Sequence, residues 1–289
     1  MMDSLWVAAL FAVFIWWFST GLVLLLDTLP RNTFRWSRLL SSLLAVAALV
    51  GLVQTAGQTS LAATYCAFSC ALLVWAWHEL SFLTGWVTGP RRTAVAADVQ
   101  GWPRFTAAVQ AILWHELAIA AGGVMILAIT WGQENQVGLW TYAVLWVMRI
   151  SAKLNLFLGV RNLSEEFLPP HLAYMGSFFR RRRMNPLMPV VVVASSWVAY
   201  LVISAALHPD TTPVQAVGLT LVGSMLVLAI VEHFFMVLPL QPSALWRWAM
   251  RKHDDEPPPG GERRKATPSA AKTVHSTAAA QDKSLLHAR

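Results

Sequence analysis

Histidine and glutamate stand next to each other at three places, each inside a stretch of chain that is otherwise apolar. A further apolar stretch carries two basic side chains and an asparagine. Ionisable groups inside a bilayer cost roughly 2.5–3.5 kcal/mol each on insertion scales, so such groups usually mark a functional site. The candidate ligands are His78, Glu79, His115, Glu116, Glu232 and His233, and the supporting polar groups are Arg149, Lys153 and Asn155.

One chemistry open to these residues is metal binding. Imidazole and carboxylate groups from several helices can hold iron, manganese or zinc. Consecutive residues of a helix point about 100° apart, however, so a histidine and the glutamate beside it do not easily face the same ion. The chain also lacks the Glu-x-x-His spacing of ferritin-like di-iron sites. The pattern is therefore compatible with a mononuclear site rather than a di-iron one.

Two other interpretations fit the same residues. A membrane histidine can be an axial ligand of a tetrapyrrole, either haem iron or chlorophyll magnesium, with a neighbouring tryptophan packed on the macrocycle. His78 and His115 each follow a tryptophan, which suits this role. Alternatively the network is purely structural, and Arg149 and Lys153 neutralise the glutamates. The residues alone do not choose between a metal site, a pigment site and an ionic network.

The composition indicates that these polar groups lie in a membrane. Of the 289 residues 56% are hydrophobic and only 13% are charged, about half the usual charged share of a soluble domain. A soluble fold of this size needs far more polar surface, so the composition excludes a cytosolic enzyme. The net charge of +7 then reflects membrane topology and contact with anionic lipid, and no nucleic-acid partner is expected.

Seven apolar segments are long enough, or nearly so, to cross a bilayer, which takes about 20 residues. They cover residues 5–26, 39–53, 61–83, 105–131, 137–160, 190–207 and 214–240. The sequence thus predicts an all-α, polytopic membrane helix bundle over residues 1–250. Residues 251–289 are rich in Pro, Gly, Ala, Ser and Thr with mixed charge, so we expect them to form a disordered cytoplasmic tail.

Basic residues are confined to alternate loops. Arginines follow the first, third, fifth and seventh segments, whereas residues 54–60, 132–136 and 208–212 contain neither Lys nor Arg. The positive-inside rule therefore predicts an external N-terminus and a cytoplasmic C-terminus. At a rise of 1.5 Å per residue, Glu79 lies ~6 Å and His115 ~15 Å from the cytoplasmic end of its helix. The candidate ligands then share the inner half of the bilayer, which predicts one polar cluster open to the cytoplasm.

The loop after the fifth segment carries further polar groups at the predicted mouth of this cluster. In one interpretation they form a lid or supply additional ligands. In the other they only cap helix ends and add surface charge. Two prolines stiffen the chain just before the last of them. These residues are Glu165, Glu166 and His171.

Residues 172–179 predict an amphipathic helix that lies on the inner leaflet between the fifth and sixth spans. Leu172, Met175 and Phe179 fall on one helical face. A polybasic end follows directly, and we expect its arginines to contact the head groups of anionic lipid. The alternative is a plain loop whose charges stop transfer across the membrane. The arginines are Arg180, Arg181, Arg182 and Arg183.

Four runs of this sequence resemble the PuhE family of anoxygenic phototrophic bacteria. The resemblance covers roughly residues 5–250 and leaves out the tail. It implies a protein of the bacterial inner membrane, cytoplasmic or intracytoplasmic, that takes part in reaction-centre assembly and in the control of bacteriochlorophyll supply. It brings no established catalytic residues. The runs are WWFSTG (16–21), WHELSFLTGWVTGPRR (77–92), TWGQENQVGLWTYAVLWVMRISAKLN (130–155) and FLGVRNLSEEFLPPHLAYMGSFFRRRRMNPLMP (157–189).

The resemblance favours a non-catalytic assembly factor over an enzyme. Such a factor would hold or hand over bacteriochlorophyll or another tetrapyrrole, or dock a nascent reaction-centre or light-harvesting subunit, and the cofactor itself is left open. The rival interpretation is a membrane oxidoreductase with an iron or zinc site of His and Glu at the inner leaflet, acting on a pigment precursor. A transporter is a third, but no helix is interrupted in mid-membrane.

Overall fold

Seven long α-helices make up most of the chain that the computed structural model describes, residues 2–239 and 242–250. Each corresponds to one predicted apolar segment, so the all-α fold class is confirmed. α2 and α4 begin a few residues early, because helical hydrogen bonding continues through polar first turns that hydropathy does not register. The predicted tail, residues 251–289, lies outside the described residues. The helices are α1 (Met2–Asp27), α2 (Phe34–Thr55), α3 (Leu61–Leu83), α4 (Gly101–Thr130), α5 (Val137–Leu158), α6 (Leu187–Ala206) and α7 (Pro213–Val237).

Six of these helices are long and apolar enough to cross a membrane, and within the described part of the chain α5 is the exception. α5 is 22 residues long, but Arg149, Lys153 and Asn155 in its second half reduce its hydropathy. It nevertheless packs among the other helices, against α3, α4 and α7. The protein is therefore a multi-pass membrane helix bundle, and a seventh span at α5 stays a prediction.

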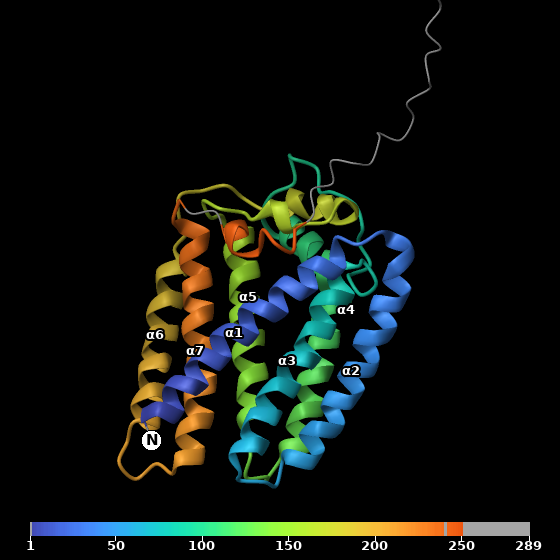
Figure 1. The fold of residues 1–289 in the computed structure, drawn as a ribbon. Helices are drawn as coiled ribbons and strands as arrows, with labels where there is room; N and C mark the ends of the chain where they lie inside the picture. Colours follow the sequence, from blue (N-terminus) through green and yellow to red (C-terminus); the bar gives the residue numbers. More distant parts are fainter. Residues whose placement is uncertain (1, 240–241, 251–289) are drawn as a thin grey trace, which may run out of the picture. The chain divides into compact units, whose positions relative to one another are not determined.

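α3 and α7 form the interior of the bundle. In each of them 56% of the most apolar window is buried, against 17% in α1 and α6. α3 contacts α1, α2, α4, α5 and α7, while α6 packs mainly on α7. Figure 1 shows α1 crossing α7 and α3 obliquely instead of running alongside them. Small residues such as Ala67, Cys70 and Ala71 are buried on α3, which allows neighbouring backbones to approach closely.

The loops are sorted by charge between the two ends of the bundle. The three loops without Lys or Arg, at residues 56–60, 131–136 and 207–212, lie at one end, and the arginine-bearing connections lie at the other (Figure 1). Two of the arginine-free loops are tied together, because the backbone N–H of Asn135 donates to the carbonyl of Ala56 over 2.9 Å. This sorting is what the charge pattern predicts. Which end faces the cytoplasm stays a prediction from charge.

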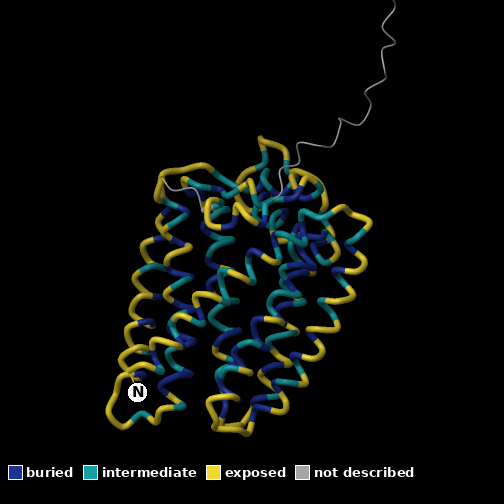
Figure 2. The backbone as a smooth tube through the Cα atoms, in the orientation of Figure 1, coloured by how far each residue is buried: buried dark blue, intermediate teal, exposed yellow. Residues whose placement is uncertain are grey.

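Large apolar side chains cover the outer faces of the bundle. Figure 2 shows exposed residues along α2 and α6, and these include Leu40, Leu43, Val193 and Trp197. Exposed apolar area on this scale is unfavourable in water, at roughly 25 cal/mol per Å². It suits a lipid environment, in agreement with the predicted membrane fold.

The arginine-bearing end is covered by short 3-10 helices, of which the longest, η3, runs over Pro170–Phe178. The helix expected between α5 and α6 is thus present, but its surroundings differ from the prediction. Leu172 and Met175 pack against Phe82 and Leu83 of α3 instead of facing lipid. A 3-10 helix has three residues per turn, so Phe178 continues this buried face. Phe179, the residue predicted on that face, has extended backbone instead.

Candidate functional site

A chamber of about 320 Å³ lies between α1, α3, α5 and α7. Its walls are mainly apolar and aromatic, and among the described residues its only charged lining groups are Glu79, Arg149 and Glu232. These three side chains come from α3, α5 and α7. Two of the predicted candidate ligands and one supporting charge therefore do face a common space.

An ion pair crosses the chamber wall between α3 and α5. The Nη2 of Arg149 donates to Oε2 of Glu79 over 2.7 Å, and 41% of the Arg149 side chain is exposed against 14% for Glu79. Neither group is saturated, because Oε1 of Glu79 and Nε of Arg149 are buried without a hydrogen-bond partner in the described structure. Each partner of the pair thus leaves one buried polar atom unsatisfied within the described structure.

Glu232 of α7 is held by a tryptophan of α1. The indole Nε1–H of Trp16 donates to Oε1 of Glu232 over 2.8 Å. The charges of Arg149 and Glu79 both act on this carboxylate, which links it electrostatically to the neighbouring ion pair. Glu232 is nonetheless exposed, and it is one of the residues lining the chamber.

Two short helices close the chamber at the arginine-bearing end. They are η2 (Glu165–Phe167) and η4 (Pro242–Trp246). Trp246 is buried, its ring lies 5.4 Å from that of Trp16, and its indole N–H donates to the carbonyl of Trp17 over 2.9 Å. The ring centroids of Phe167 and Trp246 lie 6.1 Å apart. The cover is therefore built from aromatic rings that belong to distant parts of the chain.

A second ion pair lies between α4 and α5 and does not line the chamber. Lys153 donates to Oε1 of Glu116, and 20% and 25% of the two side chains are exposed. The ammonium group lies 6.0 Å from the ring centroid of Phe82, which adds a cation–π contact. Lys153 is one helical turn beyond Arg149, so α5 carries both cations of the polar interior on adjacent turns.

His78 is part of a buried contact between α3, α4 and α5. The hydroxyl of Tyr142 donates to the carbonyl of Ile119 over 2.8 Å. The same hydroxyl lies 3.0 Å from Nε2 of His78, so this imidazole nitrogen must be the donor to the tyrosine oxygen. A Cβ on Gly122 would lie 2.7 Å from both His78 Nε2 and Tyr142 Oη. The absence of a side chain at Gly122 is therefore what makes room for this contact.

His115 is buried with neither ring nitrogen hydrogen-bonded in the described structure. Its ring lies 4.5 Å from that of Phe82. The backbone N–H of His115 donates to the carbonyl of Thr88 over 2.9 Å, which fastens the loop before α4 onto the helix. His115 is therefore a buried imidazole in an aromatic and polar contact region, and it does not line the chamber.

His233 belongs to a separate network of polar residues. Its Nδ1–H donates to the carbonyl of Ala229 over 2.8 Å, which leaves Nε2 to accept from the hydroxyl of Ser151 at 2.9 Å. Asn155 donates to the carbonyl of Ser151, and Asn185 donates to Oδ1 of Asn155 over 2.9 Å. This network joins α7, α5 and the segment before α6. Its side-chain partners are satisfied, which is the pattern of a structural connection.

The loop residues predicted at the mouth of the cluster lie apart from the chamber charges. Glu165 is ion-paired with Arg181 at 3.7 Å on the surface, and Glu166 is exposed. His171 donates its Nε2–H to the carbonyl of Leu83 over 2.8 Å. Burial lowers the pKa of His171, and its bond to that carbonyl only partly opposes the effect. Glu165 therefore connects η2 to the arginine run, and His171 connects η3 to the end of α3.

A family model described as "Protein of unknown function (DUF3623)" matches residues 2–257, which is most of the chain. The chain belongs to the DUF3623 family. A relative from Rhodobacter capsulatus, described as "Uncharacterized 30.4 kDa protein in puhA 5'region", is 36% identical over 258 residues, covering 88% of this chain and 94% of the relative. No solved structure matches the chain.

In the DUF3623 chain the residues of the predicted cluster make separate contacts. These are the chamber charges, the Lys153–Glu116 pair, the His78–Tyr142 contact, the buried His115 and the His233 network. Neighbouring residues point to different helices, as the 100° step of an α-helix requires. Glu79 faces the chamber while His78 contacts Tyr142, and Glu232 faces the chamber while His233 contacts Ser151. Trp16, Trp246, Ser151 and Asn185 were not predicted as site residues. Their partners lie far away in the sequence. Trp16, Ser151 and Asn185 fell within runs that carried the family resemblance, whereas Trp246 did not.

The described residues of the DUF3623 chain bring together no group of three or more His, Cys, Asp or Glu side chains that could hold a metal ion. Such a group is what iron or zinc requires of a protein site. None of the three histidines of the apolar segments lines the chamber, so the expected axial-ligand histidines are buried elsewhere.

Proposed function

We propose that this protein is a PuhE-type assembly factor of the photosynthetic inner membrane, and that its chamber holds bacteriochlorophyll or another tetrapyrrole for delivery to reaction-centre or light-harvesting subunits. One observation supports a role in photosynthesis: the Rhodobacter capsulatus relative is described by its position in the puhA 5′ region, a reaction-centre gene region. The proposed role is binding and transfer of a ligand, and no reacting group is assigned.

The lining of the chamber supports an apolar, aromatic ligand. Trp16, Trp75, Phe167 and Trp246 all line it, together with aliphatic side chains of four helices. Aromatic rings offer large flat surfaces for packing against a macrocycle. The volume of about 320 Å³ lies at the lower end of the range of small-molecule pockets, so the chamber would enclose only part of a macrocycle. A water-soluble substrate would require many more polar groups in these walls.

The polar groups of the chamber fit a ligand that carries a hard metal ion or polar substituents. Magnesium prefers oxygen ligands, and the carboxylates of Glu232 and Glu79 are the anionic oxygens that line the space. We therefore assign Glu232 the ligand role that the sequence had suggested for His78 or His115. Arg149 lines the same space, and its guanidinium would donate to a carbonyl or carboxylate substituent of the same ligand.

The outer faces of the bundle are suited to a helical membrane partner. α2 and α6 present large apolar side chains to the surroundings (Figure 2). Helices of a nascent reaction-centre subunit can pack on such faces in place of lipid, because transmembrane helices and lipid tails both present apolar surface. In this proposal the protein meets its partner laterally within the membrane.

The ligand is tested by purification of the full chain in mild detergent from a host that makes bacteriochlorophyll and from one that does not. We expect an absorption band of a bound tetrapyrrole only in the first preparation, and a reduced band in Glu232→Gln. This variant keeps an oxygen that can accept the Trp16 N–H. The matched control is Glu134→Gln, because Glu134 is an exposed acid in an arginine-free loop. Identical spectra from the two hosts would contradict the ligand assignment.

The process is tested separately by deletion of the gene in a phototrophic host. Loss of the protein should lower the amount of assembled reaction centre measured from its absorbance, and the natural chain should restore it. We expect Glu134→Gln to restore it equally well and Glu232→Gln to restore less. Unchanged reaction-centre levels after deletion would contradict the assembly role, whether or not the purified protein binds a tetrapyrrole.

A further inference from the structure

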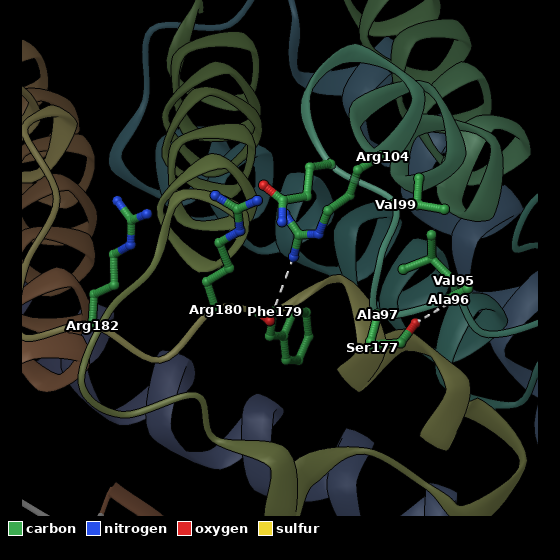
Figure 3. Close-up of a pocket in the computed structure, with 10 residues that line it drawn as sticks. Val95, Ala96, Ala97, Val99, Arg104, Ser177, Phe179, Arg180 and Arg182 are labelled. Carbon is green, nitrogen blue, oxygen red and sulfur yellow. Dashed lines mark hydrogen bonds between the residues drawn. The ribbon is translucent and has the colours of Figure 1, made fainter.

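A second pocket, of about 430 Å³, lies at the arginine-bearing end of the bundle and is separate from the chamber. Three chain segments form it: the loop before α4, the first turn of α4, and the extended segment after η3 (Figure 3). Its side chains include three arginines, a glutamine and a serine. They are Gln100, Arg104, Ser177, Arg180 and Arg182.

Arg104 is buried in this pocket, and no carboxylate of the described residues is paired with it. Only 5% of the residue is exposed. Its Nη2 donates to the carbonyl of Phe178 over 2.6 Å, and its Nη1 to that of Phe157 over 3.4 Å. These acceptors are neutral, and the guanidinium carbon also lies 4.5 Å from the ring centroid of Phe157, a cation–π contact. These contacts position the guanidinium, and none of the described residues supplies an anion to balance its charge. A buried cation of this kind is costly unless an anion comes close to it.

Arg180 brings a second positive charge to the same place. Figure 3 shows the side chains of Arg104 and Arg180 pointing toward one another above Phe179. The two charges act on each other unfavourably. Arg182 lines the pocket as well, and its stem crosses Gly159, where a Cβ would lie 2.7 Å from Cγ of the arginine. The fold thus collects like charges at one pocket instead of separating them.

The backbone decides which arginines of the polybasic run face the pocket. Phe179 is extended and Arg181 forms a parallel bridge with Val160, whose backbone bonds to Arg180 and Arg182 as in a strand. Alternate side chains of an extended segment point to opposite sides. Arg180 and Arg182 accordingly line the pocket, whereas Arg181 turns to Glu165 at the surface. Four identical neighbours in the sequence are therefore not equivalent in the structure.

The start of α4 adds to the positive potential. The N-cap residue Gln100 makes no side-chain cap hydrogen bond, and the first turn contains no acidic residue. The first backbone N–H groups of a helix carry partial positive charge and favour an anion. Asp98 is the acid closest in sequence, but it is exposed and is not among the residues that line the pocket.

We propose that this pocket binds a phosphate group, and specifically the phosphodiester of an anionic lipid head group. Arginine recognises phosphate oxygens through its planar set of N–H donors. The pocket lies at a helix end beside Trp102, which is 72% exposed, as is typical of aromatic residues at a membrane interface. Val95, Val99 and Phe179 line the same pocket and offer apolar contact to a lipid. Free phosphate shares the chemistry of the head group but makes no use of this apolar surface.

The test uses the purified full chain in detergent, titrated with phosphatidylglycerol or with phosphatidylcholine of the same acyl chains, and bound lipid is counted by native mass spectrometry. Inorganic phosphate is titrated in a parallel calorimetric arm. The pocket variant is Arg180→Gln with Arg182→Gln. The matched control is Arg181→Gln with Arg183→Gln, which removes the same charge from the same segment but on the side away from the pocket. Arg182→Gln alone is a milder second variant, because Arg182 is exposed.

We expect phosphatidylglycerol to bind in preference to phosphatidylcholine. The pocket variant should bind phosphatidylglycerol at least about tenfold more weakly than the natural chain, which is the factor that one charge-assisted hydrogen bond supplies. The control should bind as the natural chain does, and Arg182→Gln should lie between. If only inorganic phosphate binds and the pocket variant loses it, the phosphate site stands but its source is soluble. An equal loss in pocket variant and control, or no preference for phosphatidylglycerol together with no phosphate binding, overturns the proposal.

Discussion

Arg149 on α5 and Glu79 on α3 form a 2.7 Å ion pair at the wall of a chamber whose only other charged lining residue, within the described chain, is Glu232. Two carboxylates and one guanidinium leave a formal excess of one negative charge at this place. Of the three side chains only Glu79 is largely buried, with 14% of its side chain exposed. The relationship makes this trio the part of the protein most directly open to mutational test.

Removal of either partner of the Glu79–Arg149 pair should lower stability. Glu79→Gln leaves the guanidinium without its carboxylate, and we expect a loss of about 1–3 kcal/mol, toward the lower value because 41% of the Arg149 side chain is exposed. The measurement is the free energy of unfolding in detergent for Glu79→Gln, Arg149→Gln and the double variant. The double variant should lose less than the sum of the single losses. Strict additivity would show that the two charges do not interact.

Gly122→Ala should destabilise the contact between α3, α4 and α5. The added Cβ would lie 2.7 Å from both Nε2 of His78 and Oη of Tyr142, and forced overpacking of this kind costs roughly 1–3 kcal/mol. The control is Gly123→Ala, where the nearest atom, Cε1 of Tyr142, is 3.3 Å away. Thermal unfolding midpoints in detergent compare the two. A larger loss for Gly123→Ala would contradict the packing described for His78.

His171 should make stability depend on pH in the acidic range. Burial lowers the pKa of His171 from its usual 6.5, against the opposing effect of its bond to the Leu83 carbonyl. Above pH 6.5 the imidazole is neutral in both the folded and the unfolded chain, so its contribution is complete. As the pH falls below this value, the unfolded chain binds a proton that the folded chain does not, and stability declines until the lower, folded-state pKa is passed.

The unfolding midpoint at about pH 7.5 and about pH 5.5 tests this dependence. His171→Asn keeps a donor for the Leu83 carbonyl but cannot titrate, so its midpoint should fall less between the two values than that of the natural chain. The other histidines are present in both proteins and cancel in the comparison. Equal slopes would mean that His171 is not shielded from protonation.

Topology reporters should place the two ends of α5 on opposite sides of the membrane. A reporter active only in the cytoplasm should be inactive when fused at Gln58 or Gln136, and active when fused at Arg161 or after Trp248. The basis is the sorting of arginines to one end of the bundle (Figure 1). Activity at both Gln136 and Arg161 would show that α5 does not span. Activity only at Gln58 and Gln136 would reverse the orientation.

The helices were readable from sequence because a membrane imposes a local requirement. Each backbone N–H and C=O in the hydrocarbon region must be satisfied within its own segment, so an apolar run of sufficient length is enough to predict a helix. All seven predicted segments are helical, and the arginine-bearing loops lie together. The predicted segment 61–83 agrees with α3 at both ends, because the apolar run is bounded by Ser60, the N-cap residue, and Thr84, the C-cap residue.

The grouping of the polar residues could not be predicted from local sequence. The depth of Glu79, Glu116 and His233 follows from counting along each helix, but the neighbour that each one faces depends on how the helices are rotated about their axes. That rotation is set by packing between segments far apart in sequence, as between Gly122 and His78 or Trp16 and Glu232. The sequence by itself determined which residues are polar and how deep they lie. Only the tertiary structure decided that they form a chamber, an ion pair and a separate network, because side-chain direction changes by about 100° with each residue.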